Sequence, residues 1–180
     1  MAGALAGCGG SAPATFDLTA PTSGIGGRPT RAQILVAEPN ATSPVDGDRI
    51  VVRTGAESVA YLSGAQWAER LPRLIQTRLI QTFENGKSLR SVGRVGDKMV
   101  ADSTLTTEIR RFEIDVTTGQ AVVEMSAKLV GEMSGRVMAA KIFSASAPGS
   151  ASDGAAAAAA LDAALSSVLR QIVAWTSARG

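Results

Sequence analysis

The sequence predicts an α+β fold: a single-domain sandwich of a mixed or antiparallel sheet with two main helices packed on it. The length of 180 residues suits one domain with its own core. Short β-branched segments fill the first third of the chain, and a region of alternating apolar and polar residues follows later. Two longer segments carry apolar residues at helical spacing, and their apolar faces need a sheet to cover them.

Four short strands are expected before the first helix. Residues 15–19 alternate apolar and polar side chains, and residues 33–37 form a compact apolar run. Residues 49–53 and 58–62 are rich in β-branched and aromatic side chains, with Gly55 between them as a tight connection. The Gly-, Ser- and Thr-rich stretch 21–29 and the turn-forming stretch 43–48 are predicted to be loops.

The first helix is expected to follow a capping box formed by Ser63 and Gln66. Apolar residues then recur at helical spacing from Trp67 to Phe83. Pro72 leaves two alternatives, because an interior proline kinks a helix whereas a first-turn proline opens one. Asn85-Gly86 is expected to end the helix.

Residues 89–143 are predicted to form an antiparallel meander. The alternation changes parity at Arg110-Arg111, which indicates a β-bulge. Residues 123–129 alternate cleanly, as in a half-buried strand, and turns are expected at Thr118-Gly119 and Ser134-Gly135.

The second helix is expected over residues 155–175, with one apolar face. Its length and alanine content raise the alternative of a membrane span, but Asp162, Arg170 and Gln171 would be costly in lipid, so a helix docked on the sheet is favoured. Each helix is expected to carry one of the two tryptophans, Trp67 and Trp175, as a packing residue.

Composition narrows the function. The chain has no histidine, which removes the Ser-His-Asp triad and His-ligated zinc, and no paired acids suggest a shared cleft. We therefore expect no enzyme activity, no catalytic residues, no cofactor and no metal site. The formal net charge is only +2, without a basic stripe, so no nucleic-acid partner is expected.

The lone cysteine, Cys8, ends the tetrapeptide Leu5-Ala6-Gly7-Cys8, which looks like the lipobox of bacterial lipoprotein precursors. The alternative is an incidental cysteine in a disordered leader. Residues 1–14 are interpreted as a truncated signal remnant, the lipobox and a flexible tether, because a basic and apolar leader is missing. Residues 15–180 form the expected domain.

Several ordered segments resemble the ABC-type transport auxiliary lipoproteins, the family that includes the paraquat-inducible protein C type and the auxiliary component of "cholesterol transport" systems. The segments that carry the resemblance are Cys8-Gly9-Gly10, Phe16-Asp17-Leu18, residues 36–39, residues 48–53, Tyr61-Leu62, residues 66–69, residues 71–76 and residues 111–114.

The resemblance implies an auxiliary lipoprotein without an ATPase of its own. Such proteins work with mammalian-cell-entry (MCE) domain proteins and an ABC permease and ATPase, and they move lipids between the inner and outer membranes. Cys8 would be the lipidation site and membrane anchor. Gly9 stands where aspartate would signal inner-membrane retention, so the periplasmic face of the outer membrane is favoured.

Two further hypotheses differ in class. In the first, the domain binds a lipid in an apolar groove of its own and acts as a periplasmic shuttle or acceptor. In the second, the chain is a hydrolase with carboxylate or lysine chemistry, which the absence of histidine disfavours. A homo-oligomer stays open as a further kind of partnership.

Overall fold

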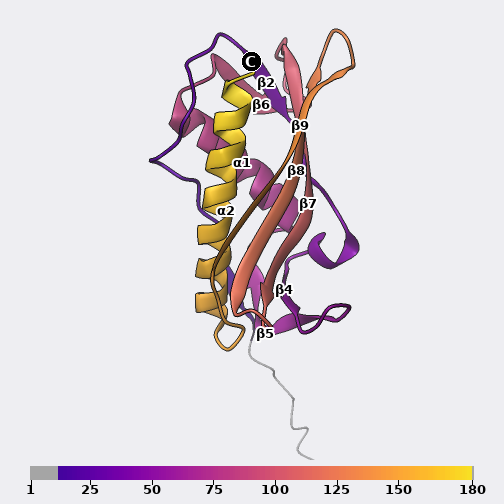
Figure 1. The fold of residues 1–180 in the computed structure, drawn as a ribbon, viewed down its shortest axis with the longest axis vertical. Helices are drawn as coiled ribbons and strands as arrows, with labels where there is room; N and C mark the ends of the chain where they lie inside the picture. Colours follow the sequence, from indigo (N-terminus) through magenta and orange to yellow (C-terminus); the bar gives the residue numbers. More distant parts are fainter. Residues whose placement is uncertain (1–11, 180) are drawn as a thin grey trace, which may run out of the picture.

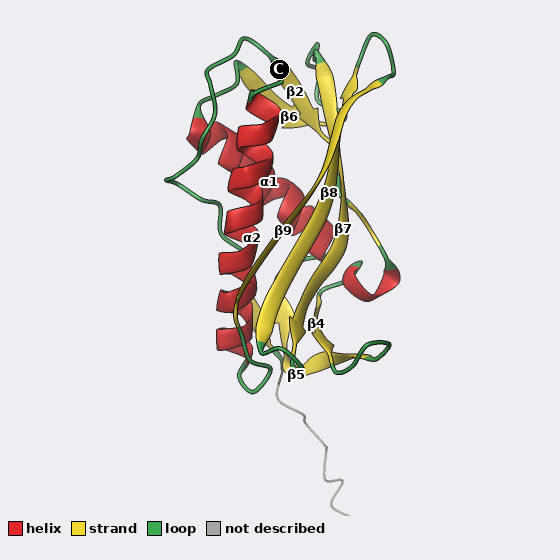
Figure 2. Ribbon diagram, viewed as in Figure 1, coloured by secondary structure: helices red, strands yellow, loops and turns green. Residues whose placement is uncertain are grey.

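The computed structural model describes residues 12–179, which form a curled nine-stranded sheet with two long helices on one side (Figures 1 and 2). This arrangement confirms the predicted α+β class. In chain order the elements are β1 (Ala14–Phe16), β2 (Gln33–Val36), β3 (Asn40–Ala41), the short 3-10 helix η1 (Ser43–Val45), β4 (Arg49–Arg53), β5 (Val59–Trp67), α1 (Leu71–Gly86), β6 (Ser91–Arg94), β7 (Ser103–Asp115), β8 (Gln120–Gly131), β9 (Val137–Pro148) and α2 (Gly154–Ser177).

The long strand β7 organises the sheet. Along one edge it pairs in parallel with β2, then β3, then β4, each beside a different part of its length. Along its other edge it pairs with β8, which pairs in turn with β9, and both pairings are antiparallel. The sheet is therefore mixed, with a meander on one side of β7 and short parallel neighbours on the other.

The predicted meander is confirmed for β7, β8 and β9, including the bulge, since the β7–β8 register shifts between Ile109 and Arg111. The inward side chains of β8 from Val123 to Leu129 are buried, as the alternation predicts. The segment after α1 is an exception. Strand β6 belongs to the other side of the sheet, where it pairs in parallel with β2.

The predicted start of the first helix is wrong. Residues 63–67 continue β5, and α1 begins at Leu71 with Pro72 in its first turn, so the first-turn alternative for Pro72 is correct. Trp67 consequently lies on a strand and not on a helix. Its N–H donates to the Asp48 carbonyl at 2.6 Å, and the residue pairs with Phe16 of β1. These non-local bonds override the local capping-box pattern.

Helix α1 ends where Asn85-Gly86 predicts. The left-handed residue is the next one, Lys87, at φ 49°, and its N–H donates to the Phe83 carbonyl at 3.1 Å.

Helix α2 packs against the meander with the predicted apolar face. The members of that face are fully buried: Leu161, Leu165, Val168, Leu169, Ile172 and Val173. Asp153 caps the helix, because its carboxylate accepts hydrogen bonds from the N–H groups of Ala155 and Ala156. By length and mean hydropathy (1.3) α2 could cross a membrane, yet half of that window is buried within the fold. A helix docked on the sheet, as expected, accounts for its composition.

Candidate functional site

The interior between the sheet and the helices is filled by side chains. Phe112 packs edge-on against Trp67, with ring centroids 5.8 Å apart, and Phe143 does the same with Trp175 at 5.6 Å. Both tryptophans are buried, which fits their predicted role as packing residues.

Residues 12–179 contain no group of three or more His, Cys, Asp or Glu side chains that could hold a metal ion. Cys8, the predicted lipidation site, lies outside the described residues. The nearest described strand is β1, which pairs with the last residues of β5. At the start of α2, a Cβ added to Gly154 would lie 3.3 Å from the Phe16 ring, so β1 enters the fold beside the first turn of that helix.

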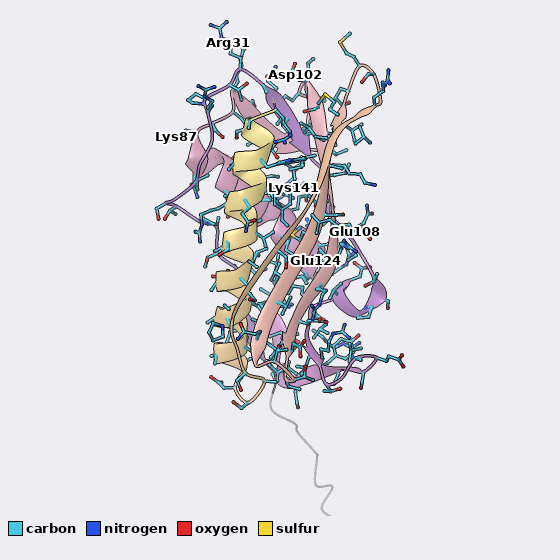
Figure 3. All side chains as sticks on the ribbon, viewed as in Figure 1. Arg31, Lys87, Asp102, Glu108, Glu124 and Lys141 are labelled. Carbon is cyan, nitrogen blue, oxygen red and sulfur yellow. The ribbon has the colours of Figure 1, made fainter. Side chains whose placement is uncertain are left out.

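The two ends of the molecule consequently differ. The chain enters at the end where α2 begins, and the far end holds the last turn of α2, the β6–β7 loop and the β8–β9 hairpin (Figure 1). Arg31 and Asp102 project at that far end (Figure 3). The Glu132 N–H donates to the Asp102 carbonyl at 3.1 Å, which ties the hairpin to the loop. Met133 and Val100 are highly exposed on these two connected turns.

An ion network lies on the face of the sheet that the helices leave uncovered, near the ends of β4 and β7. Glu113, only 3% exposed, accepts two hydrogen bonds from Arg53 at 2.7 and 3.0 Å and one from Arg111 at 2.7 Å. Arg111 also reaches Asp115 at 3.4 Å. The hydrogen bonds to Glu113 raise the pKa of Arg53 above its usual value. We call these four residues the Glu113 network.

The Asp115 carboxylate of the Glu113 network accepts hydrogen bonds that favour its charged form. The Thr117 hydroxyl donates to Asp115 at 2.6 Å, and this bond is the main cause of the lowered pKa of that carboxyl. Glu113 joins β7 to Arg53 of β4 across a parallel strand pair. The network therefore fastens two strands together. Its members come from positions 53 and 111–115, and only the sheet register brings them together, so sequence reasoning missed it.

The rest of the uncovered face is formed by β7, β8 and β9. We call it the outer face and define it by Glu108, Glu124, Ser126, Lys128 and Ile142, whose side chains lie on the side of the sheet away from α2. Glu108 and Glu124 are labelled in Figure 3. Ser126 donates to Glu108 at 3.2 Å, and Arg110 pairs with Glu124 at 3.3 Å.

Between β8 and β9 the surface carries a shallow hollow of about 470 Å³, lined by Ser126, Ala127, Lys128, Ala140, Lys141 and Ile142. At the far end a second hollow of about 420 Å³ lies among Arg31, Asp102, Met138 and Arg179, with Thr30, Ala32 and Ser103 completing its wall. Both are surface features of the β9 side of the molecule.

Comparison with known proteins gives a consistent picture. A family model described as the ABC-type transport auxiliary lipoprotein component matches residues 15–173. An uncharacterized protein of Bradyrhizobium diazoefficiens is 33% identical over 174 residues, which cover 93% of this chain and 47% of that protein. The chain thus spans about half the length of this curated relative.

Two crystal structures share the fold. One is a Xanthomonas campestris protein of the family DUF330, with a TM-score of 0.79 and 30% identity over 93% of each chain. The other is an uncharacterized protein with a TM-score of 0.70, 14% identity, and coverage of 93% of this chain and 98% of its own. The second likeness shows the fold alone.

The family match runs from β1 into the last turns of α2 and so takes in every strand of the sheet. It names a lipoprotein, which places the family at a membrane of the cell envelope, and a component of ABC-type transport, which is an accessory role. The chain belongs to the ABC-type transport auxiliary lipoprotein family.

Proposed function

We propose that this protein is the non-enzymatic auxiliary lipoprotein of an MCE-type ABC transporter that moves lipids between the inner and outer membranes. It acts by docking onto the transport complex, and it sits on the periplasmic face of the outer membrane. The observation that carries the proposal is the family match from residue 15, directly after a lipobox-like Leu5-Ala6-Gly7-Cys8.

The anchor is proposed to be Cys8. One acyl chain holds a protein to a bilayer only marginally, and two or more chains make attachment long-lived. Because β1 enters at one end of the fold, an anchored domain would present its far end, with Met133 and Val100, away from the membrane that holds it. That orientation favours contact with a component that reaches across the periplasm.

We favour docking over lipid carriage because the interior is filled by side chains and the hollows lie on the surface. The core side chains that face α2 are fully buried and packed together, including Leu105, Ile109 and Phe112. A lipid shuttle would need an apolar groove that covers most of its ligand, whereas the hollow between β8 and β9 is a shallow surface feature. Native mass spectrometry distinguishes the two proposals, since a shuttle carries a stoichiometric lipid.

The test is co-purification from detergent-solubilised membranes of the source cells, with the chain expressed behind a complete signal peptide. We expect wild-type protein to recover an MCE-domain protein together with the permease and ATPase. Cys8→Ser protein, made without lipid, should fractionate away from membranes but bind the same partners when added back. Recovery of none of these components across several mild detergents would refute the proposal.

A further inference from the structure

Strand β9 is a long open edge of the sheet. It has 12 residues and, in the described part of the chain, pairs only with β8. The strands that end the other side of the sheet are short, with 3 residues in β1 and 4 in β6. Long edges offer a row of unpaired N–H and C=O groups to any added strand, so proteins usually shorten, charge or cover them.

The register shows which groups of β9 are free. The Gly149 N–H donates to the Gly119 carbonyl at 3.0 Å, and the β8–β9 register runs unbroken from there to Leu129 and Ala139. Residues of an antiparallel strand alternate between facing the partner strand and facing away from it. The odd-numbered residues from 139 to 147 therefore bond to β8, and the N–H groups of Ala140, Ile142, Ser144 and Ser146 point outward. Pro148, which has no N–H, stands at the next outward position.

The edge lacks the usual protection against an added strand. Its one charged residue is Lys141, whose ammonium lies 5.2 Å from the centroid of the Phe143 ring. Val137 and Ile142 are 56% and 52% exposed, so the strand also offers apolar side chains to a partner. The hollow of about 470 Å³ lies beside Ile142 along the same edge.

Charge indicates what kind of chain fits. Lys128 and Lys141 both line the hollow, and within residues 12–179 neither forms an ion pair. Lys141 lies on the edge strand itself, and its ammonium is on the same side of the sheet as the Phe143 ring, opposite Ile142. A second copy joined edge to edge over this half of β9 would bring the two Lys141 side chains close together without a carboxylate between them. A strand that alternates apolar and acidic side chains would instead place its apolar side chains beside Ile142 on the outer face and its carboxylates beside Lys141 on the other face.

We propose that the outward edge of β9 is the docking site for an extended segment of a partner protein, with alternating apolar and acidic side chains, which adds a strand to the sheet. This inference rests on the proposed function, because it names the surface through which the domain docks. The outward N–H and C=O groups of residues 140–146 supply main-chain hydrogen bonds. Ile142 and the hollow receive the apolar side chains on the outer face, and Lys141 receives the carboxylates on the opposite face.

Amide hydrogen exchange of the full chain tests the inference without the transport complex. The probe is a synthetic peptide of about ten alternating valine and glutamate residues, as long as the open part of the edge. We expect the Ile142 and Ser144 amides to exchange at least tenfold more slowly with the peptide present. The Phe143 and Ala145 amides, already bonded to β8, should not change.

Two variants of one residue give a matched pair. Ser144→Pro removes an outward N–H and leaves the bonds to β8, so it should abolish the protection of Ile142 by the peptide. Ser144→Thr keeps that N–H and should behave as wild type. Lys141→Glu tests the charge and should weaken binding of the acidic peptide severalfold. This variant tests the inference if Ser144→Pro fails to fold.

Three results would overturn the inference. The first is unchanged exchange at Ile142 and Ser144 with millimolar peptide. The second is protection of these amides by phosphatidylglycerol vesicles and not by the peptide, which would indicate a lipid surface. The third is protection that grows with protein concentration alone, which would indicate self-pairing. Failed co-purification of an MCE protein would refute the proposed function but would leave these outcomes unchanged.

Discussion

The two faces of the sheet are built on different physical principles. The face of the sheet toward the helices is covered by apolar packing. Phe112, Ile114 and the apolar face of α2 are completely or almost completely buried there. The opposite face carries no helix in residues 12–179, and there the charged Glu113 is almost completely buried and held by two guanidinium groups. One layer of helices thus covers a single face of the sheet, and ion pairs shield the buried charge on the other face.

Substitutions on the helix-facing side of the sheet should have the largest effect on stability. Phe112→Ala should lower the free energy of unfolding by about 3–5 kcal/mol, because it removes a fully buried ring that packs against Trp67. Urea unfolding followed by tryptophan fluorescence measures the change. Phe112→Leu is the control, with a smaller loss expected. A loss below about 1 kcal/mol for the alanine variant would contradict the assignment of this face as the stabilising one.

A smaller effect is expected in the Glu113 network. Glu113→Gln keeps the shape of the side chain but leaves Arg53 and Arg111 without their shared carboxylate, and should cost about 1–3 kcal/mol of unfolding free energy. Glu108→Gln, on the exposed part of the same strand, should change stability by less than about 0.5 kcal/mol. Equal effects from the two variants would mean that the network contributes no more than an ordinary surface pair.

The sequence predicts those features of the two faces that depend on residues close together in the chain. The helix-facing side is visible in local patterns, such as the period of α2 and the alternation of β8, because burial imposes those periods on the chain. The bulge at Arg110-Arg111 is visible for the same reason, since the parity change is local.

The features that sequence analysis missed all depend on pairing between distant segments. The sequence predicts too early a start for α1 because Ser63 and Gln66 match a local cap, whereas pairing with β1 and β4 extends β5 to Trp67. The parallel pairing of β6 with β2 joins segments on either side of α1. Glu113 stands between two core residues, Phe112 and Ile114, which could have marked it as a charge needing a partner, but the register alone identifies Arg53.

The stability that the Glu113 network contributes should depend on pH through Asp115. The Asp115 pKa is lowered in the folded protein from its ordinary value near 3.8, chiefly by the Thr117 hydroxyl. Between the folded and unfolded pKa values the unfolded chain binds more protons, so acid favours unfolding. The stabilisation is thus complete above the unfolded pKa and is lost as pH falls below about 4 toward the folded pKa.

Thr117→Val should therefore flatten the dependence of stability on pH in this acidic window and leave the difference between pH 6 and pH 7 unchanged. Thermal unfolding of both proteins from pH 2.5 to pH 7 provides the measurement. Thr118→Val is the control, since the Thr118 side chain makes only a long contact with the Asp115 carbonyl. A steeper acid loss in Thr117→Val than in wild type would mean that another group dominates the titration.

Substitution of Ile142 should have the smallest effect on the free energy of unfolding. Comparison with Phe143 tests whether the two sides of the same strand contribute differently to stability. Ile142 is half exposed on the outer face, whereas its neighbour Phe143 is fully buried against Trp175. Ile142→Thr keeps a β-branched residue and should change unfolding free energy by less than about 0.5 kcal/mol. Phe143→Ala should cost about 3–5 kcal/mol.

Binding should show the reverse order for the same two positions. Co-purification of the transport complex should fall severalfold with Ile142→Thr, because the variant removes apolar contact at the docking edge. A matched Phe143→Leu protein that stays folded should retain its partners, because the Phe143 ring faces α2 and not the open edge. Equal loss of partners by Ile142→Thr and Phe143→Leu would contradict this prediction. It would mean that partner binding depends on the stability of the whole domain and not on the exposed side chains of β9.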